Sequence, residues 1–221
     1  MREAATGARG THRMAASTNK VLREGSTQKR AAILEAGREL FLADGFDRTS
    51  VDAIAARAGV SKRTVYDYFG DKKAVLLAVV SEAWGALSAE IEKAVGAHLD
   101  DVTDAESALI AFSRDVANSA LGSADYVALT RLVSVEAGHI PELLDSVEAA
   151  EPEDLLAERF EELDRLGLLN APDARLAADH FVALTFSTAY DNSRLGKRHD
   201  GAYAERMITE GVRAFLRAYG P

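Results

Sequence analysis

The chain has 221 residues, of which 48% are hydrophobic and 28% are charged, and this composition fits one large or two small folded domains with a sizeable core. No run approaches the roughly 18 consecutive apolar residues of a membrane-spanning helix, and the N-terminus has no apolar signal-peptide core, so we expect a cytoplasmic protein without membrane contact. Because the chain has no cysteine, disulfides and thiolate metal sites are excluded.

Charge is unevenly distributed along the chain. Residues 1–73 contain 14 Lys and Arg against 9 Asp and Glu, a net charge of +5, whereas residues 74–221 contain 12 against 26, a net charge of −14. A basic segment can approach polyanionic DNA, while an acidic remainder favours solubility. The pattern favours a DNA-binding N-terminal part, although an accident of composition would also produce it.

Residues 1–26 have no sustained apolar period and are rich in small and polar residues, so we predict a disordered basic arm. Its cations could follow the DNA backbone or enter a minor groove, or the segment could be a solvated tail. From residue 27 to 43, apolar side chains recur at helical spacing. This helix should form the platform of a small domain, and Asp44 and Gly45 should end it.

Two short helices joined by a tight turn are predicted between Ser50 and Phe69. Ser50 and Ser61 can each cap a helix with the side-chain hydroxyl, and Gly59 can take the left-handed conformation that a sharp turn needs. The first helix has an apolar row at i, i+3, i+4 and i+7. Helix, glycine turn and second helix are the parts of a helix-turn-helix.

The second helix, residues 62–69, offers hydrogen-bonding side chains on its outer face, which are Lys62, Arg63, Thr64, Tyr66 and Tyr68. Lys62 and Arg63 lie at the end that normally enters the major groove, and the Arg63 guanidinium fits guanine O6 and N7. Thr64 could contact a thymine methyl group or a phosphate. Tyr66 should hold a phosphate, although Tyr66 and Tyr68 could instead pack against the preceding helix.

Five further residues are assigned to the DNA surface: Ser50, Ser61, Asp67, Lys72 and Lys73. Ser50, at the start of its helix, would add a phosphate contact. Asp67 could accept a hydrogen bond from a cytosine amino group or turn toward Lys62, Arg63 or a nearby lysine. Lys72 and Lys73 begin the next helix, where they and the helix dipole can meet a phosphate.

That next helix is predicted over residues 71–99. At 1.5 Å per residue it is about 40 Å long, enough to begin in the DNA-proximal domain and end deep in the C-terminal domain, and so to couple the two. Apolar spacing predicts further helices to the C-terminus, and three of the four prolines fall at predicted helix starts. The predicted ranges are 104–121, 124–137, 141–149, 152–166, 172–195 and 201–219. The sequence therefore predicts an all-α protein.

Enzyme signatures are absent from the sequence. It has no P-loop, dinucleotide GxGxxG, GxSxG elbow or HExxH, and its five histidines are too scattered to suggest a metal cluster. We therefore predict no catalysis, no cofactor and no metal site.

The run from Ala58 to Phe69, continued by Asp71 to Leu76, resembles the signature of the TetR family of bacterial transcriptional regulators. The resemblance covers roughly residues 28–77. It implies a homodimeric repressor in which a helix-turn-helix, here residues 27–71, binds a palindromic DNA operator. It also implies phosphate contacts by Tyr68 and Lys72, and a C-terminal helical domain, residues 72–221, that binds a small effector and dimerises through its last two helices.

Five residues are candidates for an effector pocket in the C-terminal domain: Trp84, Phe112, Arg131, Phe181 and Tyr190. Core packing without any ligand explains each of the four aromatic residues as well or better, and Arg131 could pair with an acidic neighbour instead of an anionic ligand. Two alternatives to a ligand-responsive repressor stay open. The chain could be a ligand-independent dimeric DNA-binding protein, or a helical enzyme or partner-binding domain with a vestigial helix-turn-helix.

Overall fold

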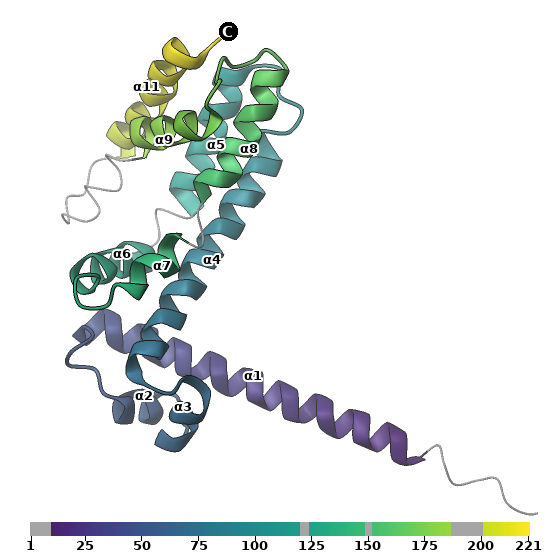
Figure 1. Ribbon diagram of the computed structural model, residues 1–221, viewed down its shortest axis with the longest axis vertical. Coiled ribbons are helices and arrows are strands. Elements are labelled where there is room, and N and C mark those ends of the chain that lie inside the picture. Colours follow the sequence, from purple (N-terminus) through teal and green to yellow (C-terminus); the bar gives the residue numbers. More distant parts are fainter. Residues whose placement is uncertain (1–9, 120–123, 149–151, 187–200) are drawn as a thin grey trace, which may run out of the picture. The chain divides into compact units, whose positions relative to one another are not determined.

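The computed structural model describes residues 10–119, 124–148, 152–186 and 201–221 (Figure 1). Within these ranges the regular structure is entirely helical, which confirms the predicted all-α class. The chain divides into two compact units, Met1–Val79 and Val80–Pro221. The boundary falls inside one continuous helix, α4 (Lys72–His98).

Helix α1 extends over Gly10–Asp44 and is longer than predicted. The expected disordered arm over residues 1–26 is corrected, because residues 10–26 are already helical; residues 1–9 lie outside the described part. The segment lacks proline and contains several good helix formers. Adding residues to a helix that packing has already nucleated costs little, so α1 can continue without an apolar face of its own.

The first unit is built around the C-terminal half of α1, together with α2 (Val51–Arg57), α3 (Lys62–Phe69) and the first turns of α4. Its core side chains are at most 4% exposed and come from all four helices: Ile33, Leu34, Ala36, Phe41, Ile54, Ala55, Val65, Val75, Leu76 and Val79. The buried Thr49 hydroxyl donates to the carbonyl of Gly45 (2.8 Å), which fixes the loop between α1 and α2. The unit thus holds α2 and α3 on a packed base.

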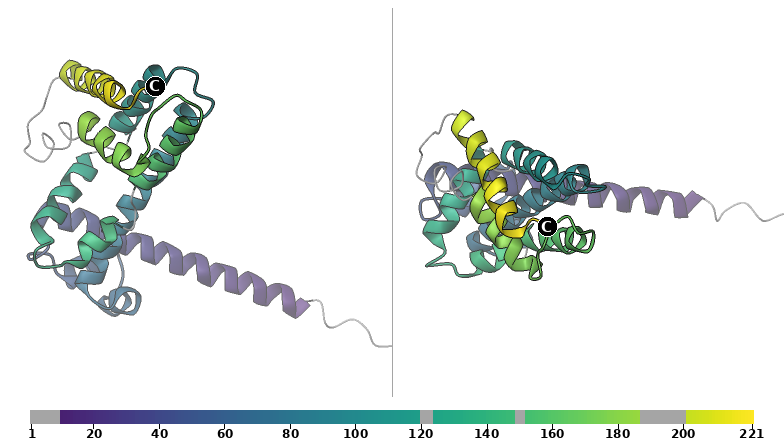
Figure 2. Two further views of the ribbon diagram at one scale, coloured as in Figure 1. Left: turned by 45° about the horizontal axis from the view of Figure 1, so that its top comes forward. Right: turned by 90° about the horizontal axis from the view of Figure 1, so that it is seen from above.

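The second unit contains the C-terminal part of α4 and the remaining helices, which Figure 2 shows from two further sides. They are α5 (Ala105–Ser119), α6 (Ala124–Glu136), α7 (Glu142–Glu148), α8 (Pro152–Arg165), α9 (Ala174–Thr185) and α11 (Gly201–Tyr219). The predicted ranges match within a few residues, except that the helix expected over 172–195 is α9 up to Thr185; residues 187–200 lie outside the described part.

Helices α5, α8, α9 and α11 enclose a cluster of fully buried aromatic rings. The Phe181 ring lies 5.2 Å from Phe215 and 5.5 Å from Phe160, both edge-on, and 6.2 Å from Phe112. Edge-to-face pairs at such separations are favourable. These rings and the aliphatic side chains around them form the main core of the unit.

Ion pairs on the surface join neighbouring helices of the second unit. Arg114 and Arg213 of α5 and α11 pair with Glu205 and Glu106 of the opposite helix, and the Arg213–Glu106 distance is 2.9 Å. Each pair raises the pKa of its arginine. These side chains are about half exposed, so the pairs contribute little to the stability of the fold.

Helix α4 is long and apolar enough, by length and composition, to cross a membrane. Core helices of soluble proteins have the same properties. Several apolar side chains of α4, including Leu87, Ile91 and Val95, are buried in the core of the second unit. Part of the apolar surface of α4 is therefore buried within the protein.

Gly211 lets α11 approach the end of α9. A Cβ atom at residue 211 would overlap the backbone carbonyl of Leu184 and lie 3.2 Å from the Cα of Thr185. The backbone of α9 cannot rotate away from the new methyl group as a flexible side chain could. We therefore expect Gly211→Ala to lower the free energy of unfolding by about 1–2 kcal/mol. Urea denaturation at fixed protein concentration measures this change.

Gly85 is a matched control, because it lies inside α4 and a Cβ there would meet nothing within 4 Å. We expect Gly85→Ala to stabilise the protein by about 0.4–1 kcal/mol through helix propensity alone. Equal stabilisation by both substitutions would contradict the close approach of α9 and α11.

Candidate nucleic-acid interface

Serine caps and a glycine turn shape α2 and α3. The hydroxyl oxygens of Ser50 and Ser61 accept hydrogen bonds from the backbone N–H groups of Ala53 and Thr64, both at 3.1 Å. Gly59 has a φ of +66°, a conformation that glycine adopts without strain. The predicted helix-turn-helix, with both caps and the turn, is therefore present.

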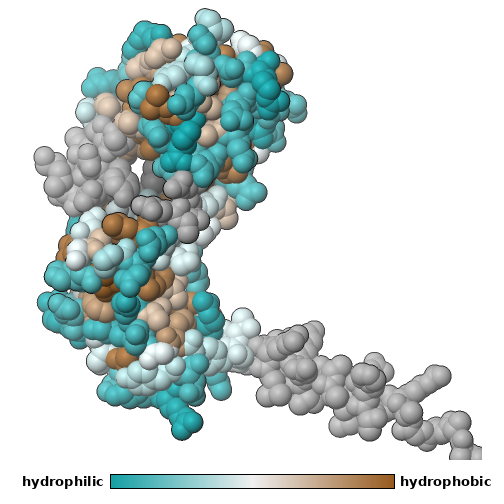
Figure 3. Space-filling view, in the orientation of Figure 1, coloured by the Kyte–Doolittle hydropathy of each residue, from teal (hydrophilic) through white to brown (hydrophobic). Residues whose placement is uncertain are grey.

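One face of α3 is packed and the other faces solvent. Val65 is buried against the unit, whereas Lys62, Arg63, Tyr66 and Asp67 are exposed. Arg63 has the most open of these side chains, at 90% exposure. The surface around α2 and α3 is largely hydrophilic (Figure 3). The exposed face of α3 offers guanidinium, ammonium and phenol donors, the groups that bind phosphates and base edges.

Acidic side chains lie beside the two cations at the start of α3. The Lys62 ammonium donates to the Asp52 carboxylate on α2 at 2.9 Å, and this bond raises the pKa of Lys62. The Arg63 guanidinium lies 3.8 Å from the Asp67 carboxylate, one turn along α3. Asp67 thus turns toward Arg63, which is one of its two predicted orientations. The contact with Asp52 was not predicted.

Thr64, Tyr68 and Lys72 have contacts inside the protein. The Thr64 hydroxyl lies 2.8 Å from the Ser61 hydroxyl. The Tyr68 phenol donates to the Ser26 hydroxyl of α1 at 2.8 Å. The Lys72 ammonium donates to the Phe46 carbonyl at 2.7 Å and lies 4.1 Å from the centre of the Phe46 ring. A phosphate contact by Tyr68 or Lys72 would have to share or replace these bonds.

The start of α4 follows directly from α3. The Asp71 carboxylate accepts from the backbone N–H of Ala74 at 2.7 Å and so caps α4. Lys73 is half-buried at the same helix start and also interacts with another group of the protein. Lys72 and Lys73 therefore lie where the helix dipole is positive, as predicted.

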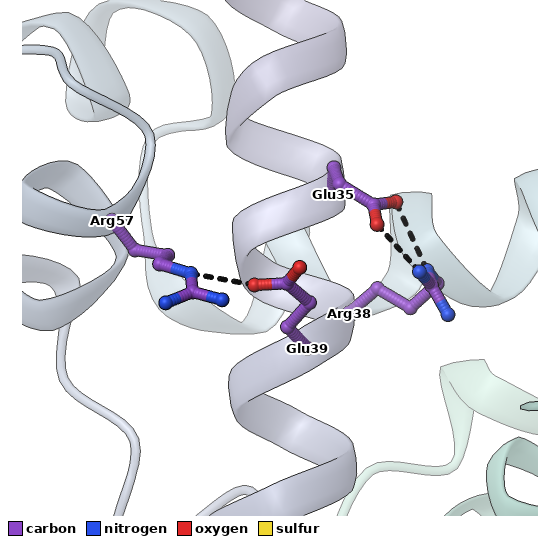
Figure 4. A network of polar contacts seen from close by, with 4 residues as sticks. All are labelled: Glu35, Arg38, Glu39 and Arg57. Atoms are coloured by element: carbon purple, nitrogen blue, oxygen red, sulfur yellow. Dashed lines mark hydrogen bonds and ion pairs between the residues drawn. The ribbon is translucent and has the colours of Figure 1, made fainter.

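A further ion pair joins α2 to α1 (Figure 4). The Arg57 guanidinium at the end of α2 donates to Glu39 of α1 at 2.6 Å, which raises the pKa of Arg57. On α1, Arg38 binds Glu35 through two nitrogens, at 2.5 and 3.0 Å, and this lowers the pKa of Glu35. The Arg57–Glu39 pair thus links the end of α2 to α1 at the surface of the first unit.

The candidate effector residues fall into different surroundings. Phe112 and Phe181 are fully buried together in the aromatic core. Trp84 is also buried, and its ring lies 5.5 Å from Tyr126 of α6. Arg131 of α6 is exposed and interacts with another group of the protein. Tyr190 lies outside the described residues.

Sequence reasoning did not identify Tyr126 or Thr130 of α6. Tyr126 contacts Trp84, and the Thr130 hydroxyl is buried without a hydrogen-bond partner among the described residues. The sequence feature that could have identified them is their spacing of four residues, which puts both on one face of a helix. In the described ranges, no group of three or more His, Asp or Glu side chains could hold a metal ion.

A capped helix-turn-helix with an exposed, donor-rich second helix, joined through one long helix to a second helical unit, defines a DNA-binding transcriptional regulator. The chain belongs to the tetR family of bacterial regulatory proteins. The model of that family's N-terminal domain matches residues 33–79, and the model described as AefR-like transcriptional repressor, C-terminal domain, matches residues 107–221. Members of this family are regulators rather than enzymes, in agreement with the sequence prediction.

Two curated relatives match parts of the chain. YdeS of Bacillus subtilis, an uncharacterized HTH-type transcriptional regulator, is 50% identical over 46 residues, which are 21% of this chain and 23% of YdeS. FasR of Mycolicibacterium smegmatis, an HTH-type transcriptional activator, is 31% identical over 104 residues, 47% of this chain and 48% of FasR. The matches thus span less than half the length of either relative.

Solved structures match almost the whole chain. A TetR-family transcriptional regulator from Mesorhizobium loti has a TM-score of 0.83 and 28% identity, with 89% of this chain and 98% of that one covered. The flavonoid-responsive regulator FrrA has a TM-score of 0.71 and 29% identity, with 88% and 98% covered. Both units of the fold therefore have counterparts in these proteins.

Proposed function

We propose that the protein is a cytoplasmic, ligand-responsive repressor that binds a palindromic operator as a homodimer. The exposed α3 face, with Lys62 and Arg63 at its start, carries the proposal, because such a face has no packing role in the first unit. Arg63 and Thr64 read bases, while Ser50, Ser61, Tyr66, Tyr68, Lys72 and Lys73 hold phosphates. Residues 27–71 act as the DNA-binding domain and residues 72–221 as the effector and dimerisation domain.

Repression is favoured by the C-terminal family model, which describes a transcriptional repressor and covers residues 107–221. The match to the activator FasR covers 48% of that protein, and a transcription assay distinguishes repression from activation. Effector binding is supported by the likeness to a flavonoid-responsive regulator over 88% of the chain.

Dimerisation is supported by apolar side chains on α9. Leu176 and Leu184 are 47% and 40% exposed, although they lie on one of the two helices that the family resemblance assigns to the dimer interface. A second copy would remove them from water. Two recognition helices held about 34–36 Å apart can read successive major grooves on one side of the DNA.

Footprinting on the DNA upstream of the chain's own coding region, with sedimentation analysis of the complex, tests the proposal. We expect a salt-sensitive, two-fold symmetric footprint occupied by one dimer, and lower transcription from that promoter in vitro. Binding without sequence preference would refute the operator-binding function. Increased transcription would replace repressor with activator.

We expect Asp52→Asn to strengthen binding to all DNA sequences about two- to fivefold. The substitution frees Lys62 from its acidic partner and removes a negative charge beside the recognition helix. The dependence of log Kd on log salt should steepen by about one unit, because one more cation is available for a phosphate. Titrations of operator and scrambled DNA at several salt concentrations measure both changes.

Glu90→Gln is the control, because Glu90 pairs with Lys93 at 3.4 Å on the surface of the second unit. It removes the same charge from a similar exposed pair and should leave the salt dependence unchanged. Equal shifts from Asp52→Asn and Glu90→Gln would indicate an effect of net charge rather than of Lys62.

A further inference from the structure

Thr130 of α6 is 3% exposed, and its hydroxyl has no hydrogen-bond partner among the described residues. The other buried hydroxyls in the described part of the second unit are satisfied within their own helices. Ser113 donates to the Leu109 carbonyl at 2.8 Å, and Thr185 donates to the Phe181 carbonyl at 2.7 Å. A buried polar group without a partner costs stability, so natural proteins retain few of them. The exception at Thr130 needs a reason.

The surroundings of Thr130 suit a bound organic molecule. Tyr126 lies one turn earlier on the same face of α6, and its half-buried ring packs 5.5 Å from Trp84. Leu129 and Val133 on the inner side of α6 are buried. The unpaired hydroxyl therefore shares a helix face with one ring of an aromatic pair, on a helix whose neighbouring aliphatic side chains are buried. Apolar walls with few polar groups are typical of small-molecule sites.

The described interior of the second unit offers hydroxyl groups and no charge. Its buried polar side chains are Ser113, Thr130 and Thr185, and the neighbouring Arg131 is exposed. An ionised ligand at Thr130 would lose its hydration without gaining a buried partner of opposite charge. A neutral ligand avoids this cost and still satisfies the hydroxyl.

We propose that Thr130 anchors the effector, and that the effector is a neutral, largely apolar molecule with a hydroxyl or carbonyl group. A threonine hydroxyl can donate to a carbonyl and can donate to or accept from a hydroxyl, so both groups fit. Trp84 and Tyr126 supply the aromatic contact. The inference rests on the proposed ligand-responsive function and adds the chemical class of the ligand.

Thermal unfolding of the free protein gives the first test. Thr130→Val keeps the shape of the side chain and removes the unpaired hydroxyl, so we expect Tm to rise by about 1–4 °C. Thr185→Val, the control, removes a satisfied hydroxyl and should lower Tm. A lower Tm in both variants would show that the Thr130 hydroxyl is satisfied in the free protein, and would overturn the proposal.

Ligand binding gives the second test, with biphenyl, 4-hydroxybiphenyl and biphenyl-4-carboxylate as matched probes. Binding is followed by calorimetry and by the fluorescence of Trp84, the single tryptophan of the chain. We expect Thr130→Val to weaken 4-hydroxybiphenyl about 3- to 10-fold and to leave biphenyl unchanged, while Thr130→Ser retains the affinity. The carboxylate should bind at least about tenfold more weakly than the phenol.

Equal weakening of both neutral probes would overturn the anchoring role of Thr130. Equal or tighter binding of the carboxylate, or no binding of any probe, would overturn the ligand class. Gel shifts with operator DNA separate this result from the proposed function, because Thr130→Val should bind the operator like the unsubstituted protein. A protein that binds its operator while failing the probe tests keeps its proposed operator-binding function and loses this inference.

Discussion

Replacing Phe181 by alanine is expected to lower the free energy of unfolding by about 3–5 kcal/mol. Phe181 is fully buried and lies at the centre of the aromatic cluster, with Phe160 and Phe215 at 5.5 and 5.2 Å. Alanine would leave a cavity that rings anchored on three other helices cannot fill by a local shift. Urea denaturation followed by far-UV circular dichroism measures the loss, at one fixed protein concentration because the proposed dimerisation would be linked to folding.

The same substitution separates two interpretations of Phe181. If it is a core residue, Phe181→Leu should cost less than about 1.5 kcal/mol and both variants should lose stability without a specific loss of effector response. If Phe181 lines an effector site, alanine should cost about 1 kcal/mol or less and change ligand affinity instead. That second outcome would contradict the packing role.

Replacing Arg63 by alanine is expected to weaken binding to the cognate operator by about 1–3 kcal/mol and to change binding to scrambled DNA much less. The guanidinium is 90% exposed at the start of α3, and its acidic neighbour Asp67 is 3.8 Å away. Because this contact is weak, the planar guanidinium of Arg63 remains available to donate two hydrogen bonds to guanine O6 and N7. Competition gel shifts with both DNAs measure the two affinities.

Two further variants identify what Arg63 contributes. Arg63→Lys keeps the charge and loses the fork, so it should retain affinity for scrambled DNA and lose most of the preference for the operator. Tyr66→Phe removes a phosphate donor and should weaken both complexes about equally. Uniform weakening by Arg63→Ala would refute base reading and leave Arg63 as a phosphate contact.

Local chemistry made most helix boundaries of this chain predictable. Pro152 begins α8, and Pro141 and Pro172 lie just before α7 and α9, because a residue without an N–H is tolerated where a helix begins. The start of α1 was missed for a related reason. Residues 10–26 carry neither an apolar period nor a strong breaker, so local sequence gave no signal for either state.

The caps and the turn of the helix-turn-helix were predictable because each depends on residues within a few positions. The contacts of Tyr68 and Lys72 were not, because their partners Ser26 and Phe46 are 42 and 26 residues away in sequence. The lack of a hydrogen-bond partner at the Thr130 hydroxyl could not be predicted from local sequence either. Thr185 is also a buried helical threonine, but it bonds to its own helix, and only the packed structure separates the two.

Helix α4 limits how this regulator could be recombined with others. Val75, Leu76 and Val79 of α4 complete the core of the first unit, and Lys72 binds the loop after α1 through the Phe46 carbonyl. A hybrid protein spliced directly after α3 would lose this part of the core and the Lys72 contact. Exchange of DNA-reading modules, in the laboratory or in evolution, therefore requires a junction beyond Val79, inside a continuous helix and in helical register.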